Sequence, residues 1–488
     1  MKTCVERCEL SPGFTISRVL IGLWQIADME RNGRSLDLPA TADAMKPYVD
    51  AGFTTFDMAD HYGSAEEIAG LFLKQHSTDV ELFTKWVPEL GPATQKNVRA
   101  AVERSLDRMQ TDRLDLLQYH TWNYADPRWL DRLYWLQELK REGLIRYLGL
   151  VNFDAAHLRI VLNSGIDIVS NQVCFSLLDR RAKSGMTELC VQHGIKLLAF
   201  GTVAGGFLSE KWLGKPEPHI DELSTWSQMK YKRFIDAAGG WDLFQDVLDV
   251  VKGIGQKIGA SIANVACRYI LDEPAVGGII IGARLGQSEH IQANLRLFRF
   301  SLDEKSRSDI SDAIKKLQPI PGDCGDEYRK PPFLTASGDL SHHIETLPDA
   351  YASRTSEDGQ SMILCGAPWD DTDSESRAER HGECIQVSGI TPTHGGRLIG
   401  GQDLSSQLRF VIDIIEGALR SLGGSLKDVI RTRVFIRNPE DSYAVALILK
   451  ERFPDILPEK SSIQIASTEL SDNDLMIKMD AEATVEKG

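Results

Sequence analysis

Short apolar segments alternate with longer helix-like segments from about residue 15 to about residue 300. Each apolar segment has the length of a strand, and most are followed by a stretch with the apolar spacing of an amphipathic helix. The apolar segments read RVLIGLW, TTFDMAD, ELFTKW, LDLLQYH, IRYLGLVN, DIVSNQV, KLLAFG and GGIIIGA in chain order. They are almost continuously apolar, which indicates parallel strands covered by helices on the outside.

Eight such strand–helix units in roughly 290 residues predict the α/β class and a closed (β/α)8 barrel, or TIM barrel. The alternative is a doubly wound open sheet. That fold usually has a glycine-rich turn after its first strand, and the corresponding segment IGLWQIADME contains only Gly22. We therefore expect residues 1–345 to form a barrel.

The pattern changes after the barrel. Residues of about 318–362 are rich in Pro, Gly, Ser and charged residues, which is typical of a tail followed by a linker. Beyond them, CIQVSGI, IRTRVFI, SSIQIAS and DLMIKMDAEATV have strand character, and SSQLRFVIDIIEGALRSLG and SYAVALILKERFP have helix character. We expect residues 346–488 to comprise a linker and a smaller α+β domain with its helices on one face of a sheet.

Composition narrows the class of protein. The 488 residues suit two domains, and the net charge of −15 argues against a nucleic-acid partner, which needs a basic surface. No apolar run is long enough for a membrane span, and the charged start MKTCVERCELSPG does not resemble a signal peptide. The 8 cysteines show no zinc-site spacing, so we expect no metal and a reducing, cytoplasmic location.

Four polar residues stand near the carboxyl ends of consecutive predicted strands, where catalytic groups of barrels gather. Asp57 and Tyr62 follow the second strand, Lys85 ends the third and His120 ends the fourth. A phenol is a weak acid unless tuned, and a nearby ammonium stabilises its phenolate while a carboxylate holds the ammonium. With an imidazole to polarise a carbonyl, the group predicts a general acid for a carbonyl that receives a hydride.

At these residues the chain resembles the aldo-keto reductase family. The resemblance covers residues of about 10–340, through FDMADHYGSAE, FTKW, LLQYH, GLVNFD, SNQV and IIIGAR. It implies Tyr62 as the proton donor, Lys85 and Asp57 as its tuning pair, and His120 as the group that orients the carbonyl.

The same resemblance implies a nicotinamide cofactor, NADP(H) rather than NAD(H). Its contacts would be Asn152, Gln172, Phe200, Gly205, Gly206, Gly282, Arg284 and Asn294. Among them, Arg284 would hold the 2′-phosphate. Two positions depart from the family pattern: Val151 replaces a common Ser, and His290 replaces a common Arg.

Three tryptophans lie just beyond predicted strands, namely Trp24, Trp86 and Trp122. They predict an apolar or aromatic substrate pocket. Packing in the core is the alternative for each of them.

Residues of about 363–488 resemble the Rid (YjgF-type) family of enamine/imine deaminases. The resemblance rests on CIQVSGITP, LGGSLKDVIRTRVFI, ERFPDILPEKSSIQIA and MIKMDAEA. It places Lys460 where active members bind a substrate carboxylate with Arg, and Asp480 where an acidic residue orients water. An ammonium does not reproduce the bidentate guanidinium fork, so two roles stay open: deaminase activity, and assembly of a homotrimer.

These observations predict an NAD(P)H-dependent oxidoreductase that reduces an aldehyde, ketone or cyclic imine of a small molecule, joined to a Rid-like domain. Two alternatives remain for the barrel. One is an NAD(P)+-dependent sugar or alcohol dehydrogenase, because the same residues serve both directions. The other is a subunit that binds the cofactor as a sensor.

Overall fold

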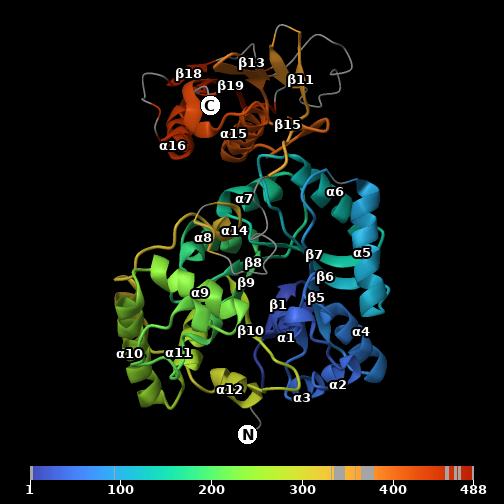
Figure 1. Ribbon diagram of the computed structural model, residues 1–488, viewed down its shortest axis with the longest axis vertical. Coiled ribbons are helices and arrows are strands. Elements are labelled where there is room, and N and C mark those ends of the chain that lie inside the picture. Colours follow the sequence, from blue (N-terminus) through green and yellow to red (C-terminus); the bar gives the residue numbers. More distant parts are fainter. Residues whose placement is uncertain are drawn as a thin grey trace.

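The computed structural model describes residues 4–485 apart from 93, 331, 335–346, 358, 364–377, 455, 457–460, 466–469 and 471–473. It consists of a larger N-terminal domain and a smaller C-terminal domain, which lies at the top of Figure 1 in orange and red. Within the described residues, no helix combines the length and the apolar character needed to cross a bilayer.

The larger domain is a closed barrel of eight strands in the order β10-β3-β4-β5-β6-β7-β8-β9, and every neighbouring pair is parallel. The strands are β3 (Val19–Gly22), β4 (Thr55–Asp57), β5 (Glu81–Trp86), β6 (Leu114–Tyr119), β7 (Ile145–Val151), β8 (Ser170–Cys174), β9 (Lys196–Phe200) and β10 (Val276–Gly282). The predicted (β/α)8 barrel is confirmed, with its strands where the apolar segments indicate.

Helices surround the barrel (Figure 1). They are α1 (Trp24–Met29), α2 (Leu38–Asp43), α3 (Lys46–Asp50), α4 (Ala65–Gln75), α5 (Gln95–Met109), α6 (Arg128–Arg141), α7 (Ala155–Asn163), α8 (Gly185–His193), α9 (Trp226–Ala237), α10 (Trp241–Ile258), α11 (Ile262–Leu271), α12 (Ile291–Arg296), α13 (Glu304–Ile314) and α14 (Asp326–Arg329). Their buried apolar residues pack on the outside of the strands in one large cluster.

An N-terminal hairpin closes one end of the barrel. It consists of β1 (Arg7–Ser11) and β2 (Phe14–Ser17), which pair antiparallel. The Phe14 ring lies 4.7 Å from the Tyr147 ring and 6.0 Å from the Phe83 ring, both early in their strands. The hairpin therefore covers the amino ends of the strands, and the carboxyl ends are left for a functional site.

The smaller domain has a seven-stranded sheet in the order β11-β12-β13-β14-β19-β17-β18. Its strands are β11 (Ser353–Thr355), β12 (Ser361–Ile363), β13 (Ala378–His381), β14 (Cys384–Ile390), β17 (Val429–Ile436), β18 (Ser461–Ile465) and β19 (Ile477–Thr484), and its helices are α15 (Leu404–Ser421) and α16 (Ser442–Arg452). A short ribbon, β15 (Thr393–His394) and β16 (Arg397–Leu398), completes it. The predicted α+β class is confirmed.

Part of the predicted linker is ordered into this sheet. Residues 353–355 and 361–363 form β11 and β12, which extend the sheet beyond β13. Composition indicated a linker because the two strands are only 3 residues long each and the outer one, β11, is wholly polar, as suits an exposed sheet edge. The linker interpretation is wrong for these residues.

Two aspartates begin the helices that join the domains. Asp154 caps α7 by accepting a hydrogen bond from the backbone N–H of His157 at 2.8 Å, and Asp403 caps α15 in the same way through Ser406 at 2.8 Å. Asp403 also accepts from Arg159 of α7 at 2.9 Å. The start of α15 is therefore fixed to the barrel as well as to its own helix.

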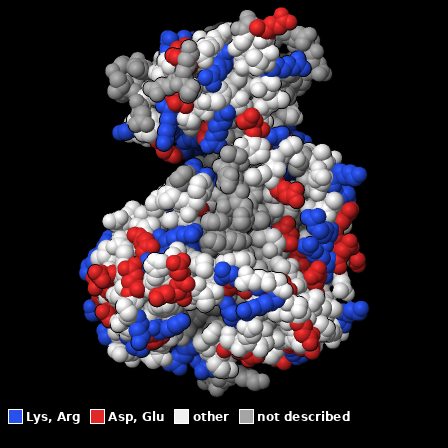
Figure 2. Space-filling view, in the orientation of Figure 1, with Lys and Arg blue, Asp and Glu red and all other residues white. Residues whose placement is uncertain are grey.

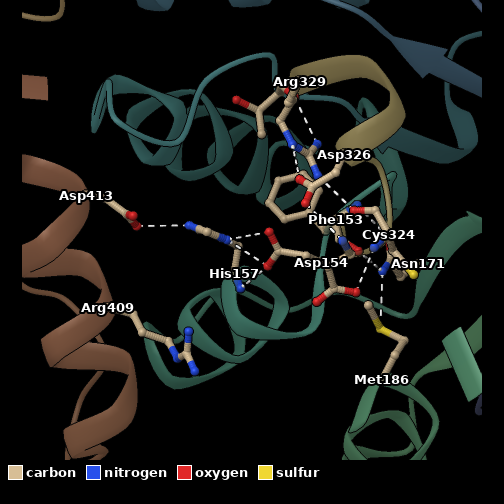
Figure 3. A network of polar contacts seen from close by, with 12 residues as sticks. Phe153, Asp154, His157, Asn171, Met186, Cys324, Asp326, Arg329, Arg409 and Asp413 are labelled. Carbon is tan, nitrogen blue, oxygen red and sulfur yellow. Dashed lines mark hydrogen bonds and ion pairs between the residues drawn. The ribbon is translucent and has the colours of Figure 1, made fainter. Parts of the chain in front are cut away.

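The domain interface is close-packed and partly charged. A Cβ on Gly417 of α15 would lie 2.2 Å from the carbonyl oxygen of Ala125, so the helix touches the barrel backbone where it has no side chain. Figure 3 shows Asp413 of α15 facing His157 of α7, with Nε2 of His157 2.9 Å from the carboxylate. Asp154 lies on the other side of the ring, 2.7 Å from Nδ1.

Acidic and basic side chains are interspersed over the visible face of both domains (Figure 2). Among the described residues, the visible face therefore carries no continuous basic stripe of the kind that binds a polyanion.

Candidate active site

The carboxyl ends of β4, β5 and β6 bring the predicted polar group together. Asp57 is the last residue of β4, Lys85 lies near the end of β5, and His120 follows β6 directly. Tyr62 lies in the turn between β4 and α4. All four side chains line one cavity of about 690 Å³, a volume in the range of cofactor and substrate sites.

A buried ion pair lies at the centre of this group. Nζ of Lys85 donates to Asp57 at 2.6 Å and to the carbonyl oxygen of Met58 at 2.8 Å, and the charged side chains are each 4% exposed. The other carboxylate oxygen of Asp57 accepts from the amides of Gln118 at 3.0 Å and Gln172 at 2.8 Å. Burial lowers the pKa of Lys85 although Asp57 opposes the shift. The carboxylate accepts three hydrogen bonds from three side chains, so it holds the ammonium in a fixed place.

The ammonium lies against the tyrosine. Nζ of Lys85 is 4.8 Å from the centre of the Tyr62 ring. A positive charge at this distance favours the phenolate, which makes a phenol a stronger acid. This arrangement is compatible with general acid catalysis by Tyr62.

His120 is buried and neutral. Burial, with a contribution from the charge of Arg329, lowers the pKa of His120 to about 3. Its Nδ1 lies 3.4 Å from the carbonyl oxygen of Val151, a long contact that imposes little on the tautomer. Its Nε2 has no hydrogen-bond partner among the described residues, although it is buried. Nε2 is thus available as a donor to a carbonyl oxygen or as an acceptor from an alcohol.

A second unpartnered atom lies where the nicotinamide contacts were predicted. Asn152 has a left-handed backbone with φ of 59°, and its Oδ1 is buried without a partner among the described residues. Such an acceptor fits the amide N–H of a nicotinamide carboxamide. Gln172 and Phe200 line the same part of the cavity. These residues fit the cofactor that the sequence predicts.

Gly325 packs against the backbone of Asn152, and the sequence analysis did not identify it. A Cβ at this position would lie 2.1 Å from the carbonyl oxygen of Asn152, and Gly325 has φ of +80°. Only glycine allows this approach. The residue lies in the stretch that composition predicted as tail and linker, so no periodicity could reveal it.

The other predicted cofactor residues line the far part of the cavity, and they are Gly205, Gly206, Gly282, Arg284 and Asn294. The guanidinium of Arg284 donates to Asp28 at 3.0 Å, an ion pair that sequence spacing could not show. Burial raises the pKa of Asp28, and the hydrogen bond from the Trp226 backbone and the charge of Arg284 oppose the rise. Part of the charge of Arg284 is therefore balanced within the protein.

Two of the three tryptophans line the cavity. The Trp24 ring lies 4.9 Å from that of Tyr62, and the Trp122 ring lies 4.4 Å from that of His120. Trp86 does not line it: this side chain packs in the core, 5.6 Å from the Tyr119 ring, because the strand turns it away from the cavity. Its placement in the substrate pocket is corrected.

Several cavity residues escaped the sequence reasoning, and three of them are Trp226, Lys230 and Tyr328. The first two belong to α9, which reads as an ordinary helix. Tyr328 belongs to α14, a helix of 4 residues inside the predicted tail. A possible signal was the aromatic and basic composition of TWSQMKYKRF, which is unusual for a solvent-covered helix.

The second predicted site is only partly described, because Lys460 lies outside the described residues. Asp480 lies on β19, where it accepts from the backbone N–H of Gly389 at 2.7 Å. Arg433 on the neighbouring strand is 3.6 Å from its other oxygen. The alternation of TRVFI places Arg433 on the same sheet face as Asp480, a signal that the sequence contained.

Comparison with known proteins finds a family match for each of the two domains. The model of the aldo/keto reductase family matches residues 18–315, and that of the endoribonuclease L-PSP family, the Rid type, matches residues 374–485.

Relatives of the barrel include flagellar radial spoke protein 5 of Chlamydomonas reinhardtii, 27% identical over 49% of this chain and 57% of the relative. The chain thus spans little more than half of that protein. The aldo-keto reductase YhdN of Bacillus subtilis is 24% identical over 66% of this chain and 96% of its own. A solved glycerol dehydrogenase from Gluconobacter oxydans shares the fold, with a TM-score of 0.54, 23% identity and coverage of 66% of this chain and 98% of its own.

The match over most of the barrel, the strand order and the grouped polar residues lead to one conclusion. The chain belongs to the aldo/keto reductase family, whose members are oxidoreductases that use nicotinamide cofactors, and it carries a C-terminal domain of the L-PSP (Rid) type.

Proposed function

We propose that the barrel reduces an aldehyde, a ketone or a cyclic imine of a small molecule with NADPH. The observation that carries the proposal is the buried Lys85–Asp57 pair beside Tyr62, in one cavity with the unpartnered Nε2 of His120. Burial of an ion pair is costly and is seldom kept at a cavity wall without a task.

Each residue has a defined part in the reaction. Bound NADPH supplies a hydride. Asn152 and Gln172 would hold its carboxamide at the strand ends. Nε2 of His120 donates a hydrogen bond to the substrate oxygen and orients it. Tyr62 gives its proton to that oxygen, and Lys85 stabilises the phenolate that remains.

The opposite direction uses the same atoms. A neutral imidazole can accept a hydrogen bond from an alcohol, and a phenolate can take its proton, so oxidation of an alcohol or sugar is the second candidate. The neutral state of His120 favours neither direction. The supply of oxidised or reduced cofactor decides between them.

NADPH is proposed over NADH because Arg284 lies at the cofactor end of the cavity with its side chain 34% exposed. A guanidinium at such a place can bind a phosphate through two hydrogen bonds. Asp28 pairs with the same guanidinium at 3.0 Å, and the remaining donors of Arg284 are the ones that would meet a phosphate.

The C-terminal domain is proposed to form a homotrimer, with deaminase activity that is weak or absent. α15 packs on β14 and β19 and separates the sheet from the barrel. The opposite sheet face carries Arg431, Arg433, Asp480 and Glu482, with side chains between 23% and 53% exposed. This face is accessible to other copies of the chain.

Turnover is tested by following NADPH and NADH absorbance with a panel of aldehydes, ketones and cyclic imines, with Tyr62→Phe as the matched inactive control. Consumption that depends on Tyr62 supports the proposal. Equal cofactor consumption by wild type and Tyr62→Phe contradicts the proposal. So does the absence of both reduction and oxidation with every substrate of the panel.

A further inference from the structure

We infer that the natural substrate carries an oxyanion, a carboxylate or a phosphate, which Lys230 binds at the substrate end of the cavity. The inference rests on the proposed carbonyl chemistry and names the class of molecule that undergoes it.

Lys230 is a buried ammonium on a cavity wall. The residue is 7% exposed, and its Nζ donates to the hydroxyl of Tyr328 at 2.6 Å. Aromatic rings surround it, with Nζ 4.5 Å from the centre of Tyr328 and 5.0 Å from that of Phe200. An ammonium has three donors, and among the described residues only one of them is used.

Its position relative to the reacting atoms is favourable. The Tyr328 ring lies 5.8 Å from the His120 ring and 4.5 Å from Nζ of Lys230, so it contacts both the imidazole and the ammonium. A molecule with its carbonyl at His120 and its anionic group one ring-width away would reach Lys230. This spacing corresponds to a substrate such as a carboxybenzaldehyde or a short semialdehyde.

Lys230 differs from the other cations of the cavity in how its charge is compensated. Lys85 is paired with Asp57, and Arg284 with Asp28. No carboxylate of the described residues lies within ion-pair distance of Lys230 Nζ. A buried charge without a direct partner is costly, and an anionic ligand would remove this cost.

A purely structural role is the rival explanation. Arg181 pairs with both Asp179 at 2.6 Å and Glu327 at 2.8 Å, which leaves one excess carboxylate in that cluster. Although Glu327 is buried, the charges of Arg181 and Lys230 lower its pKa. Lys230 balances this excess at longer range, but Glu327 does not occupy its hydrogen-bonding sites.

The test compares substrates in matched pairs: 4-carboxybenzaldehyde with 4-methylbenzaldehyde, succinic semialdehyde with butanal, and glyceraldehyde 3-phosphate with glyceraldehyde. We expect Lys230→Met to lower kcat/KM for the anionic member about 10- to 100-fold, the range for loss of a charged hydrogen bond, and to leave the neutral member unchanged. The pair with the larger loss distinguishes carboxylate from phosphate. Lys230→Arg should retain part of the preference.

The matched control is Lys232→Met, because Lys232 lies on the same helix but is paired with Glu217 and Asp236. Equal losses for both members of every pair, as a structural role predicts, would overturn the inference. So would a loss of NADPH affinity in Lys230→Met, which would assign the lysine to the cofactor.

Calorimetry separates this inference from the proposed reaction. The dissociation constants of the two benzaldehydes are measured on the NADP+ complexes of wild type and Lys230→Met, which cannot reduce them. Tighter binding of the carboxylate that disappears in Lys230→Met supports the subsite even in a protein without turnover. Equal affinity of wild type for the two compounds refutes it, whether or not turnover occurs.

Discussion

Replacing Asp413 by Ala tests how strongly the two domains are joined. The carboxylate is buried, 2.9 Å from Nε2 of His157 and 2.8 Å from Arg452. Two unit charges at 2.9 Å attract by about 6 kcal/mol at an effective dielectric constant of 20. In the variant, His157 still pairs with Asp154, and Arg452 still pairs with Glu416. We therefore expect the free energy of opening the interface between α7 and α15 to fall by about 3 kcal/mol, the lower end of the range for a broken buried pair.

The pH dependence gives a second readout. The charges of Asp154 and Asp413 raise the pKa of His157 above 6.5 in spite of its burial. A raised pKa means that the folded protein holds this proton more tightly than the unfolded chain. The stabilisation is complete below pH 6.5 and is lost as pH rises through the raised pKa. In Asp413→Asn, stability should fall less as the pH rises, since one of the two carboxylates that raise the pKa of His157 is gone.

The assay is hydrogen exchange of α7 and α15 at several pH values, because a two-domain protein need not unfold in one step. Glu451→Ala is the control: its partner Arg409 lies in the same domain, and Glu451 has a side chain that is 58% exposed, so the change should cost less than about 1 kcal/mol. Protection in Asp413→Ala equal to that in Glu451→Ala would refute the reasoning. A wild-type pH profile identical to that of Asp413→Asn would do the same.

Four further outcomes are expected from the proposed sites and the proposed assembly. Tyr62→Phe should keep cofactor affinity and lose about 10²–10⁴ in kcat, measured by steady-state kinetics and fluorescence titration; near-normal turnover would exclude Tyr62 as the acid. Arg284→Ala should weaken NADPH more than NADH in the same titration, and equal losses would show that Arg284 does not bind the 2′-phosphate. Light scattering should give a trimer for the full chain and for residues 346–488, and monomers would contradict the proposed assembly. Lys460→Arg should raise any hydrolysis of 2-iminoacids, because a guanidinium restores the fork, and strong wild-type activity lost in Lys460→Ala would show a working deaminase.

Local signals account for what the sequence predicted well. Asp57, Lys85 and His120 interrupt apolar strands at their carboxyl ends, and a parallel barrel brings such ends together. The fold followed from strand length and order alone. The assignment of Lys85 and Asp57 as a tuning pair came from the family resemblance, and the structure places the two side chains 2.6 Å apart.

Contacts between distant segments could not be predicted in this way. The pairing of Arg284 with Asp28 joins residues 256 positions apart. Tyr328 and Gly325 reach the site from a stretch without periodicity, where only the folded path of the chain decides what they touch. Trp86 shows the opposite error: its position just beyond a predicted strand suggested the cavity, but Trp86 is the last residue of β5, and alternation along the strand turns it away from the face of Lys85.

The helix α15 has consequences for protein engineering. Of its 18 residues, 14 are buried, which is far more than a helix covering one sheet needs. One side belongs to the sheet of its own domain, and the other belongs to the barrel. A Rid-type domain from another source, spliced in at the linker, would bring a helix with a solvent-adapted outer side. Successful chimaeras would have to transplant α7 and α15 as a matched pair, so the fusion point of this enzyme lies across a shared surface rather than in its linker.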